Sequence, residues 1–204
     1  MKMLDEDNVR DVAIGESEFE TLYSCAEAPL KPILLVAFDT GMRKREILDL
    51  RWEQVNLKAG TVRLAARDTK GKHPRIIVLT SRVIATLEAM KKRLPTSISG
   101  YVFVNPAKGK PWNEIRKVFD RARTAAGLPN MWFHDLRRSF VTNARRRGVA
   151  ESVVMRMSGH KTRTVFERYN VVSEDDLRNA VRVIELGSRA ELDEKKSEKG
   201  SVFS

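Results

Sequence analysis

The stretch that decides the fold is residues 40–57, TGMRKREILDLRWEQVNL, because the pattern of the sequence changes on either side of it. Before it, KPILLVAFDT (31–40) has apolar residues at helical spacing. Pro32 suits the first turn of that helix, and Gly41 is the expected end. Within the stretch, RKREILDLRW (43–52) predicts a second, short helix. The sequence therefore predicts two consecutive helices joined at Gly41.

A β-hairpin is expected after these two helices. Two runs rich in β-branched residues, 61–68 (TVRLAARD) and 74–80 (PRIIVLT), flank a turn that contains Gly71. Helical periodicity then returns and dominates the rest of the chain. The further predicted helices are 81–94, 113–126, 133–148, 150–159, 163–170 and 173–187. The expected fold is mainly α with a small antiparallel β-sheet, and nothing indicates alternating β-α units.

Three parts are expected along the chain. Residues 1–15 predict a linker or N-terminal arm, residues 16–187 a single folded domain, and residues 188–204 a polar, disordered tail. The domain is expected to open with a helix capped by Ser17, because Glu20 three residues later completes a capping-box pattern.

Composition indicates a polyanionic partner. The 204 residues include 38 Lys and Arg against 27 Asp and Glu, a formal net charge of +11. Such charge fits DNA, RNA or an anionic membrane surface and does not choose among them. No hydrophobic signal core is present, and the longest apolar run, 33–38, is too short to span a bilayer. The single cysteine, Cys25, is expected to be a small buried residue. A cytoplasmic, nucleoid-associated protein is the expectation.

The polar residues favour chemistry on a phosphodiester without a metal ion. Such a site needs cations on the non-bridging oxygens, a nucleophile, a general base and a general acid. Arginine, lysine, histidine and tyrosine occur in separate segments, whereas no carboxylate cluster suits a two-metal site. No cofactor is therefore expected. Taken singly, each candidate has a plain structural explanation: Arg43 as an ion partner of Glu46, or Tyr169 as a core aromatic.

The first two motifs resemble boxes of the tyrosine recombinases, the phage integrase family. TGMRKREILDLRW is similar to the family's first-arginine box, which implies Arg43 as a phosphate clamp and Glu46 as the acid that holds the site in shape. DTKGKHPRIIVL resembles the hairpin with the catalytic lysine, five residues before an arginine and a closing apolar strand. The resemblance implies Lys70, rather than Lys72, as the acid that protonates the leaving 5′ oxygen.

The last two motifs complete the resemblance in family order. FHDLRRSFVT is similar to the His-x-x-Arg box, which implies His134 as proton acceptor and Arg137 as second phosphate clamp. SGHKTRTVFERY resembles the final box, in which His160 donates a hydrogen bond to the phosphate and Tyr169, nine residues later, is the nucleophile. Ser158 departs from the pattern, since the family usually has an apolar residue there.

The resemblance covers residues 17–186 and implies a catalytic domain that cleaves and rejoins DNA through a 3′-phosphotyrosyl link. Implied partners are double-stranded DNA with specific recombination sites and three further copies in a homotetramer on DNA, with a monomer when free and no membrane. Family members usually carry an N-terminal DNA-binding domain, so this chain is expected to be a fragment or a minimal member. Without DNA, Tyr169 is expected to lie away from Arg43 and Arg137.

Three other functions compete with this one. Residues 150–170 also fit a helix-turn-helix DNA-binding module without catalysis. A type IB topoisomerase would use similar phosphotyrosine chemistry on one duplex, and a metal-free RNase would use two histidines. His73 matches no family role and is expected to be exposed, near DNA. The final helix has an apolar stripe at Leu177, Val181 and Ile184 that fits docking on its own domain or on a neighbour.

Overall fold

The structure is a computed structural model that describes residues 12–69, 73–93, 100–160, 162–167, 172 and 174–185. The chain divides into two compact units, Met1–Val171 and Val172–Ser204. The helices of the first unit are α1 (Glu16–Cys25), α2 (Lys31–Thr40), α3 (Lys44–Leu48), α4 (Ser81–Arg93), α5 (Arg116–Ala125), α6 (Asp135–Arg146), α7 (Glu151–Ser158) and α8 (Arg163–Glu167). Two short 3₁₀ helices, η1 (Trp52–Gln54) and η2 (Ala66–Asp68), flank the first strands.

Two small antiparallel sheets accompany the helices. The larger has the order β1-β2-β3, from β1 (Val55–Asn56), β2 (Thr61–Leu64) and β3 (Arg75–Val78). Strands β2 and β3 form the predicted hairpin, with Leu64 opposite Arg75. The smaller sheet pairs β4 (Val104–Asn105) with β5 (Lys110–Pro111). The fold is therefore mainly α with small antiparallel sheets, as the sequence predicts.

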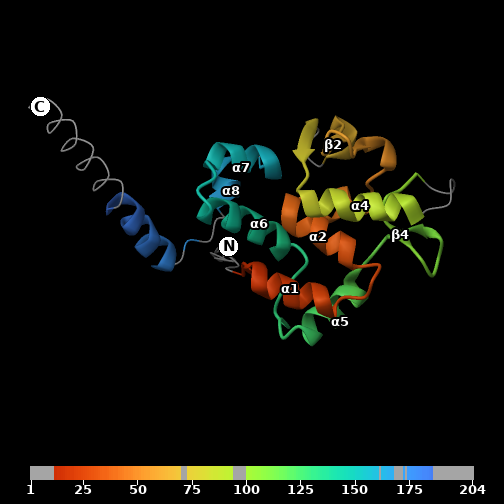
Figure 1. Ribbon diagram of the computed structural model, residues 1–204, viewed down its shortest axis with the longest axis horizontal. Helices are drawn as coiled ribbons and strands as arrows, with labels where there is room; N and C mark the ends of the chain where they lie inside the picture. Colours follow the sequence, from red (N-terminus) through yellow and green to blue (C-terminus); the bar gives the residue numbers. More distant parts are fainter. Residues whose placement is uncertain are drawn as a thin grey trace, which may run out of the picture. The chain divides into compact units, whose positions relative to one another are not determined.

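Helix α2 forms the centre of the core. Every residue from Ile33 to Thr40 is buried, because α2 packs against α1, α3, α4 and α6. In Figure 1, α4 and α1 lie on opposite sides of α2, and α6 lies beside it. Gly41 ends the helix in a left-handed conformation (φ 62°), as expected from the sequence. The chain then turns directly into α3, which carries the first candidate arginine at its N-terminal end.

A separate small cluster holds the C-terminal part of this unit. It consists of Phe140 and Val141 from α6, Val154 from α7 and Phe166 from α8. The predicted pair of short helices around residues 158–160 is confirmed in α7 and α8. The cluster fixes the turn between them against α6, and that turn carries the final candidate motif.

Three local predictions are wrong. Helix α1 begins at Glu16, and the cap is the Gly15 backbone N–H, which donates to Glu18 Oε2 at 2.9 Å, in place of the predicted Ser17 and Glu20 pair. Cys25 is exposed rather than buried, because α1 ends there. The predicted helix 43–52 is shorter, since Asp49 adopts a non-helical backbone and ends α3.

The segment before α1 takes part in the packing. Ile14 is buried in the main core, its N–H donates to Ser139 Oγ at 2.9 Å, and its carbonyl accepts from Asn143 Nδ2 at 2.9 Å. The expected boundary of an arm at residue 15 thus falls inside a stretch that is anchored on α6.

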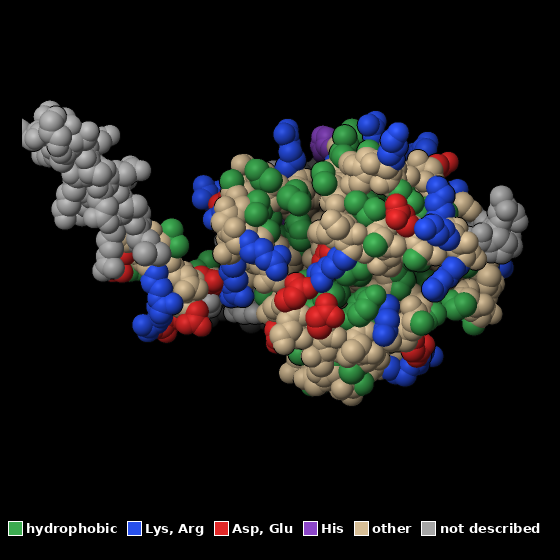
Figure 2. Space-filling view, in the orientation of Figure 1, with side chains coloured by type: hydrophobic (Ala, Val, Ile, Leu, Met, Phe, Trp, Pro, Cys, Tyr) green, Lys and Arg blue, Asp and Glu red, His purple; other side chains and the backbone are tan. Residues whose placement is uncertain are grey.

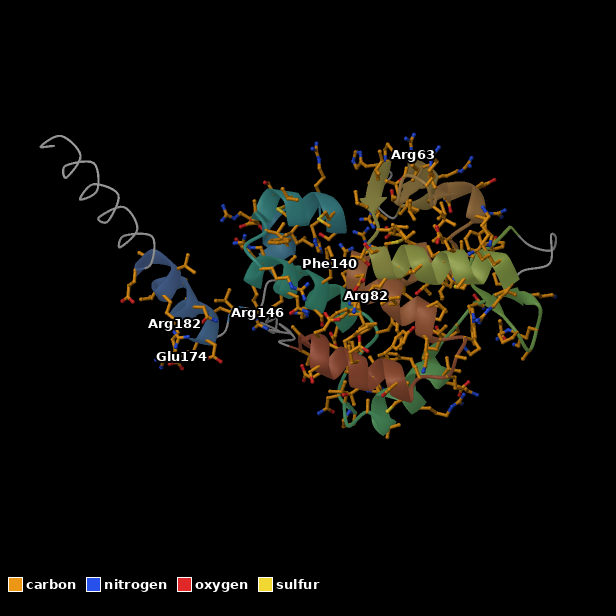
Figure 3. The ribbon with its side chains drawn as sticks, in the orientation of Figure 1. Arg63, Arg82, Phe140, Arg146, Glu174 and Arg182 are labelled. Carbon is orange, nitrogen blue, oxygen red and sulfur yellow. The ribbon has the colours of Figure 1, made fainter. Side chains whose placement is uncertain are left out.

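In the second unit, residues 174–185 are helical. Leu177, Val181 and Ile184 expose most of their side-chain surface in it. Figure 3 labels Glu174 and Arg182 on this helix. No described helix is long and apolar enough to cross a membrane.

Candidate active site

Arg43 is held at the turn between α2 and α3. Its backbone N–H donates to Glu46 Oε2 at 2.9 Å and its Nη1 donates to Glu46 Oε1 at 2.9 Å. Arg43 Nη2 donates to the Gly159 carbonyl at 3.3 Å. The Arg43 side chain remains 28% exposed, whereas that of Glu46 is 3% exposed. The carboxylate therefore orients a guanidinium that still reaches the surface.

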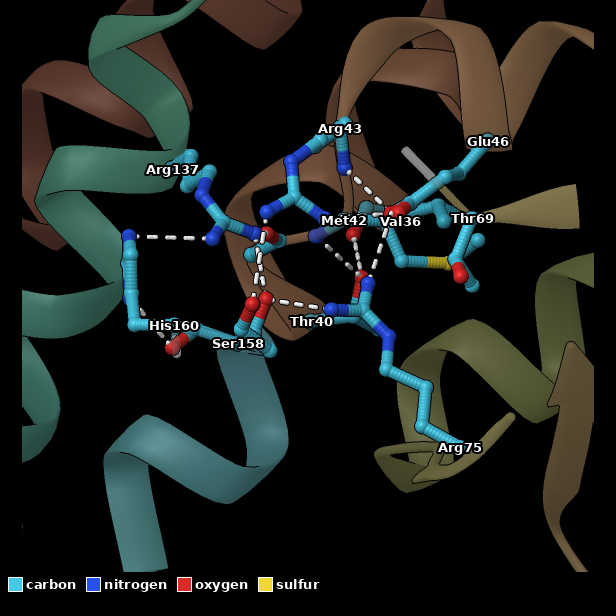
Figure 4. Close-up of polar contacts among 12 residues, drawn as sticks. Val36, Thr40, Met42, Arg43, Glu46, Thr69, Arg75, Arg137, Ser158 and His160 are labelled. Atoms are coloured by element: carbon cyan, nitrogen blue, oxygen red, sulfur yellow. Dashed lines mark hydrogen bonds and ion pairs between the residues drawn. The ribbon is translucent and has the colours of Figure 1, made fainter. Parts of the chain in front are cut away.

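Arg137 is the most deeply buried cation of the site, with 2% of its surface exposed. It projects from α6, and its Nη1 donates to the Gly41 carbonyl at 2.6 Å and to the Ser158 carbonyl at 2.5 Å. Its Nη2 lies 2.9 Å from His160 Nε2. Arg137 thus joins the end of α2 to the end of α7 (Figure 4).

The sequence Ser158-Gly159-His160 forms the C-terminal end of α7. Gly159 is left-handed (φ 75°) and turns the chain so that the Ser158 and Gly159 carbonyls both face arginines. Carbonyl groups at a helix C-terminus carry partial negative charge, so they are suitable partners for guanidinium groups. His160 comes directly after this turn and is buried against Phe166, with ring centroids 5.7 Å apart.

The partners of His160 fix where its proton lies. Ser158 Oγ donates to the Val154 carbonyl at 2.7 Å, so it accepts a hydrogen bond from His160 Nδ1, 2.7 Å away. His160 Nε2 then carries no proton and accepts from Arg137 Nη2. Burial, followed by repulsion from Arg137 and Arg43, lowers the pKa of His160 to about 3, which agrees with a neutral ring.

His134 lies at the N-terminal end of α6, one turn before Arg137. His134 is exposed at the surface. Desolvation by the atoms around the ring, followed by repulsion from Arg137, lowers the pKa of His134 to about 4. The ring is therefore neutral at pH 7, the state in which an imidazole can accept a proton.

Arg75 belongs to the same group, although no sequence motif predicted a role for it. It begins β3, its Nη2 donates to Glu46 Oε2 at 2.6 Å, and its Nη1 donates to the Ser158 carbonyl. Its side chain is 10% exposed. The motif spacing placed Arg75 five residues after Lys70. That spacing could not show that the side chain crosses to α3 and α7.

Two cavities adjoin these residues. One of about 200 Å³ is lined by Arg43, Arg75, His160 and the exposed His73, with Thr69, Pro74, Met155, Arg156 and Gly159. A larger one, of about 540 Å³, lies beside His134 and Lys44 and is lined mainly by α5 and the loop before α6. The smaller cavity is the one that Arg43, Arg75 and Arg156 line together with His160.

The structure brings together Arg43, Glu46, Arg137 and His160, with His134 beside them. Lys70 and Tyr169 lie outside the described residues, as does the expectation for where Tyr169 rests without DNA. Among the residues that the structure describes, His, Cys, Asp and Glu form no group of three or more that could hold a metal ion.

The space-filling view gives the wider electrostatic setting. Figure 2 shows Lys and Arg side chains spread over this face of the first unit, with apolar surface between them and Asp and Glu side chains at several separate places. Basic side chains spread in this way favour the approach of an anion to this face.

Solved structures share this fold. The crystal structure of XerA recombinase superposes with a TM-score of 0.73 at 22% identity, over 83% of this chain and 63% of that one. A lambda integrase dimer bound to a core site gives a TM-score of 0.62 at 18% identity, over 77% of this chain and 47% of that one.

Curated proteins of known type are similar to this chain in sequence. The prophage integrase IntF of Escherichia coli (strain K12) is 30% identical over 165 residues, 78% of this chain and 35% of that protein. The tyrosine recombinase XerA of Pyrococcus horikoshii is 27% identical over 183 residues, 85% of this chain and 61% of that protein. The chain thus spans between about a third and three-fifths of these relatives' length.

The family match extends far beyond the two short helices that suggested a DNA-binding module. The sequence model of the phage integrase family matches residues 3–175, which include the arginine, lysine, histidine and tyrosine motifs alike. The chain belongs to the phage integrase family.

Proposed function

We propose that this chain is the catalytic domain of a site-specific DNA recombinase. It cleaves and rejoins strands through a 3′-phosphotyrosyl intermediate, without a metal ion. One observation carries the proposal: Arg43 and His160 line one small cationic cavity, and Arg137 Nη2 lies 2.9 Å from His160 Nε2, so three separate segments bring these side chains together. Guanidinium groups held in fixed directions stabilise charge that develops on phosphate oxygens in the transition state.

The phosphate clamp consists of Arg43, Arg137 and His160. The arginines bind the non-bridging oxygens, and Glu46 keeps Arg43 in place. His160 joins them as a hydrogen-bond donor once Nε2 takes a proton from solvent. A bound phosphate favours that step, because a nearby negative charge raises the pKa of a histidine.

Proton transfer and bond formation belong to Tyr169, His134 and Lys70. The Tyr169 oxygen attacks the scissile phosphorus and its proton passes to His134, whose neutral ring can accept it. The bond from phosphorus to the 5′ oxygen breaks, and Lys70 gives that oxygen a proton. The covalent link conserves the phosphodiester energy, so the reverse sequence rejoins the strand.

The partner is double-stranded DNA that contains a recombination site, on which four copies assemble from monomers. Two structures of proteins with this fold support DNA as the partner, because each was solved with a bound DNA site. XerH is bound to a difH substrate, and lambda integrase is bound to a core site. The exposed Leu177 and Val181 of helix 174–185 support contact with a neighbouring copy, since clustered apolar side chains favour burial in an assembly.

A covalent-adduct assay tests the function. The protein is incubated with a labelled, nicked suicide duplex whose central sequence is randomised, and adducts are isolated on a denaturing gel and sequenced. Wild type is expected to give an adduct with a defined sequence, and Tyr169→Phe none, because only the tyrosine oxygen can attack. The chain has three tyrosines, so Tyr23→Phe and Tyr101→Phe are matched controls that should keep the adduct.

The same assay separates the alternatives. A DNA-binding module would retain the duplex without any adduct. A topoisomerase would relax a supercoiled plasmid and give adducts without sequence preference. An adduct that persists in Tyr169→Phe would contradict the assignment of the nucleophile.

A further inference from the structure

Arg75 links three elements: β3, α3 and the C-terminal end of α7. It is the first residue of β3. Its Nη2 donates to Glu46 Oε2 on α3 at 2.6 Å, and its Nη1 donates to the Ser158 carbonyl at the end of α7. The same Ser158 carbonyl accepts from Arg137, and the same Glu46 carboxylate holds Arg43. Arg75 therefore touches a partner of each arginine in the clamp (Figure 4).

The approach of Arg75 gives the glycine of the final motif a physical reason. A Cβ built on Gly159 would overlap Arg75 Nη1, so a larger residue would push the guanidinium off the Ser158 carbonyl. Gly159 also has φ 75°, which side chains with a Cβ rarely adopt. The helix end, its left-handed turn and Arg75 thus fit together as one unit.

The charges explain what Arg75 contributes. Glu46 is buried, and with Arg43 as its single partner it would neutralise that arginine and cancel its charge at the cavity. With Arg75 bound to Oε2, the group of Arg43, Arg75, Arg137 and Glu46 has three positive charges and one negative. Burial lowers the pKa of Arg75 while Glu46 raises it, yet a guanidinium stays charged at neutral pH.

We infer that Arg75 is a positioning residue for the phosphate clamp: it balances Glu46, so that Arg43 keeps its charge for the phosphate, and it fixes the Ser158 carbonyl that orients Arg137. The inference rests on the proposed function. It assigns Arg75 no contact with the reacting atoms. The positive charge of Arg75 and the positioning of the clamp by its two hydrogen bonds are separate contributions, and different substitutions of Arg75 remove them.

Sulfate binding measures the charge, because sulfate resembles the phosphate anion and needs neither DNA nor Tyr169. The 204-residue protein is titrated with sulfate and followed by ¹⁵N NMR of its arginine and histidine side chains. Arg75→Gln is expected to bind sulfate about tenfold more weakly, as loss of one nearby charge requires. The double variant Glu46→Gln/Arg75→Gln, which restores the net charge, is expected to return to within about twofold of wild type.

The rate of adduct formation tests whether Arg75 positions the phosphate clamp. Arg75→Lys keeps the charge but cannot bind Glu46 and the Ser158 carbonyl in the same fork geometry. It is expected to keep sulfate affinity within about twofold while forming the adduct about tenfold more slowly at saturating DNA. A purely structural role would lower the amount of folded protein and leave the rate per folded molecule unchanged.

The control is an arginine that binds another buried carboxylate. Arg82 Nε donates to Asp39 Oδ2 at 2.7 Å, and Figure 3 places Arg82 on α4. Arg82→Gln is expected to lower the melting temperature and leave sulfate affinity and adduct rate unchanged.

Three results would overturn the inference: wild-type sulfate affinity in Arg75→Gln, no recovery in the double variant, or a wild-type adduct rate in Arg75→Lys. If Arg75→Gln does not fold, Arg75→Lys and the double variant still decide. If wild type itself forms no adduct, the proposed function fails, whereas the sulfate arm still tests Arg75.

Discussion

At the scale of single residues, His160 shows how a site can be set by its neighbours. Ser158 and Arg137 occupy its two nitrogens and hold the ring neutral, with the proton on Nδ1. The residues of the proposed clamp could be selected from the sequence, because each of their motifs is local in sequence. The contribution of Ser158 could not, since a serine before Gly159 is only a small departure in the sequence until its hydroxyl is seen between His160 and Val154.

The pKa of His160 leads to a prediction about stability. Its value falls from 6.5 in the unfolded chain to about 3 in the folded one. Below about pH 6.5 the unfolded state binds a proton that the folded state does not bind, so the free energy of unfolding falls as the pH is lowered towards 3. Between pH 7 and pH 5 this group should account for a loss of about 2 kcal/mol.

Denaturant unfolding at pH 7 and pH 5 measures this loss. His160→Gln is expected to lose less stability than wild type over that interval, by about the 2 kcal/mol that the histidine contributes. His73→Gln, at an exposed position, is the matched control and should behave like wild type. An equal pH dependence in wild type and His160→Gln would contradict the burial of a neutral ring.

At the scale of elements, the close approach of α2 and α6 positions the site. Gly41 ends α2 with φ 62°, and a Cβ there would lie 2.5 Å from Phe140 Cδ1. Figure 3 labels Phe140 on α6, the helix that also carries Arg137. Because the Gly41 carbonyl accepts from Arg137, the glycine allows both the packing and the hydrogen bond.

Gly41→Ala is expected to lower the free energy of unfolding by about 2–4 kcal/mol, from a strained left-handed backbone and a clash with Phe140. Gly127→Ala is the control: its φ is 73°, but no atom lies within 4 Å of the added Cβ. It should cost about 1 kcal/mol, the backbone contribution alone. Chemical denaturation measures both, and equal costs would show that the α2–α6 contact does not resist an added methyl group.

Helices and strands could be predicted from the sequence where a single pattern of residues is strong. They could be predicted less well where two patterns compete. The buried stripe of α2 and the β2–β3 hairpin agree with the periodicity and the β-branched runs. The start of α1 could not be predicted, because Glu18 caps Gly15 as readily as Glu20 could have capped Ser17. Strand β1 has two residues and forms only by pairing with β2, so no local pattern could predict it.

At the scale of the whole molecule, the net charge of +11 favours the proposed binding to DNA. Binding of a polycation to duplex DNA releases counterions, and each phosphate contact adds about −0.9 to the slope of log affinity against log salt. Arg156 is exposed on α7 and lines the smaller cavity, so it stands where DNA would approach the clamp. Its contribution should therefore appear in the salt dependence.

Binding to a random-sequence duplex, measured by fluorescence anisotropy from about 50 to 200 mM salt, is expected to weaken about 10²-fold, as about four phosphate contacts require. Arg156→Gln should reduce the slope by about 1, since it removes one such contact. Arg121→Gln is the control, because Arg121 lies on α5 and pairs with Glu27 on the surface. An unchanged slope in Arg156→Gln, or an equal reduction in Arg121→Gln, would place the DNA on a different face from the arginine clamp.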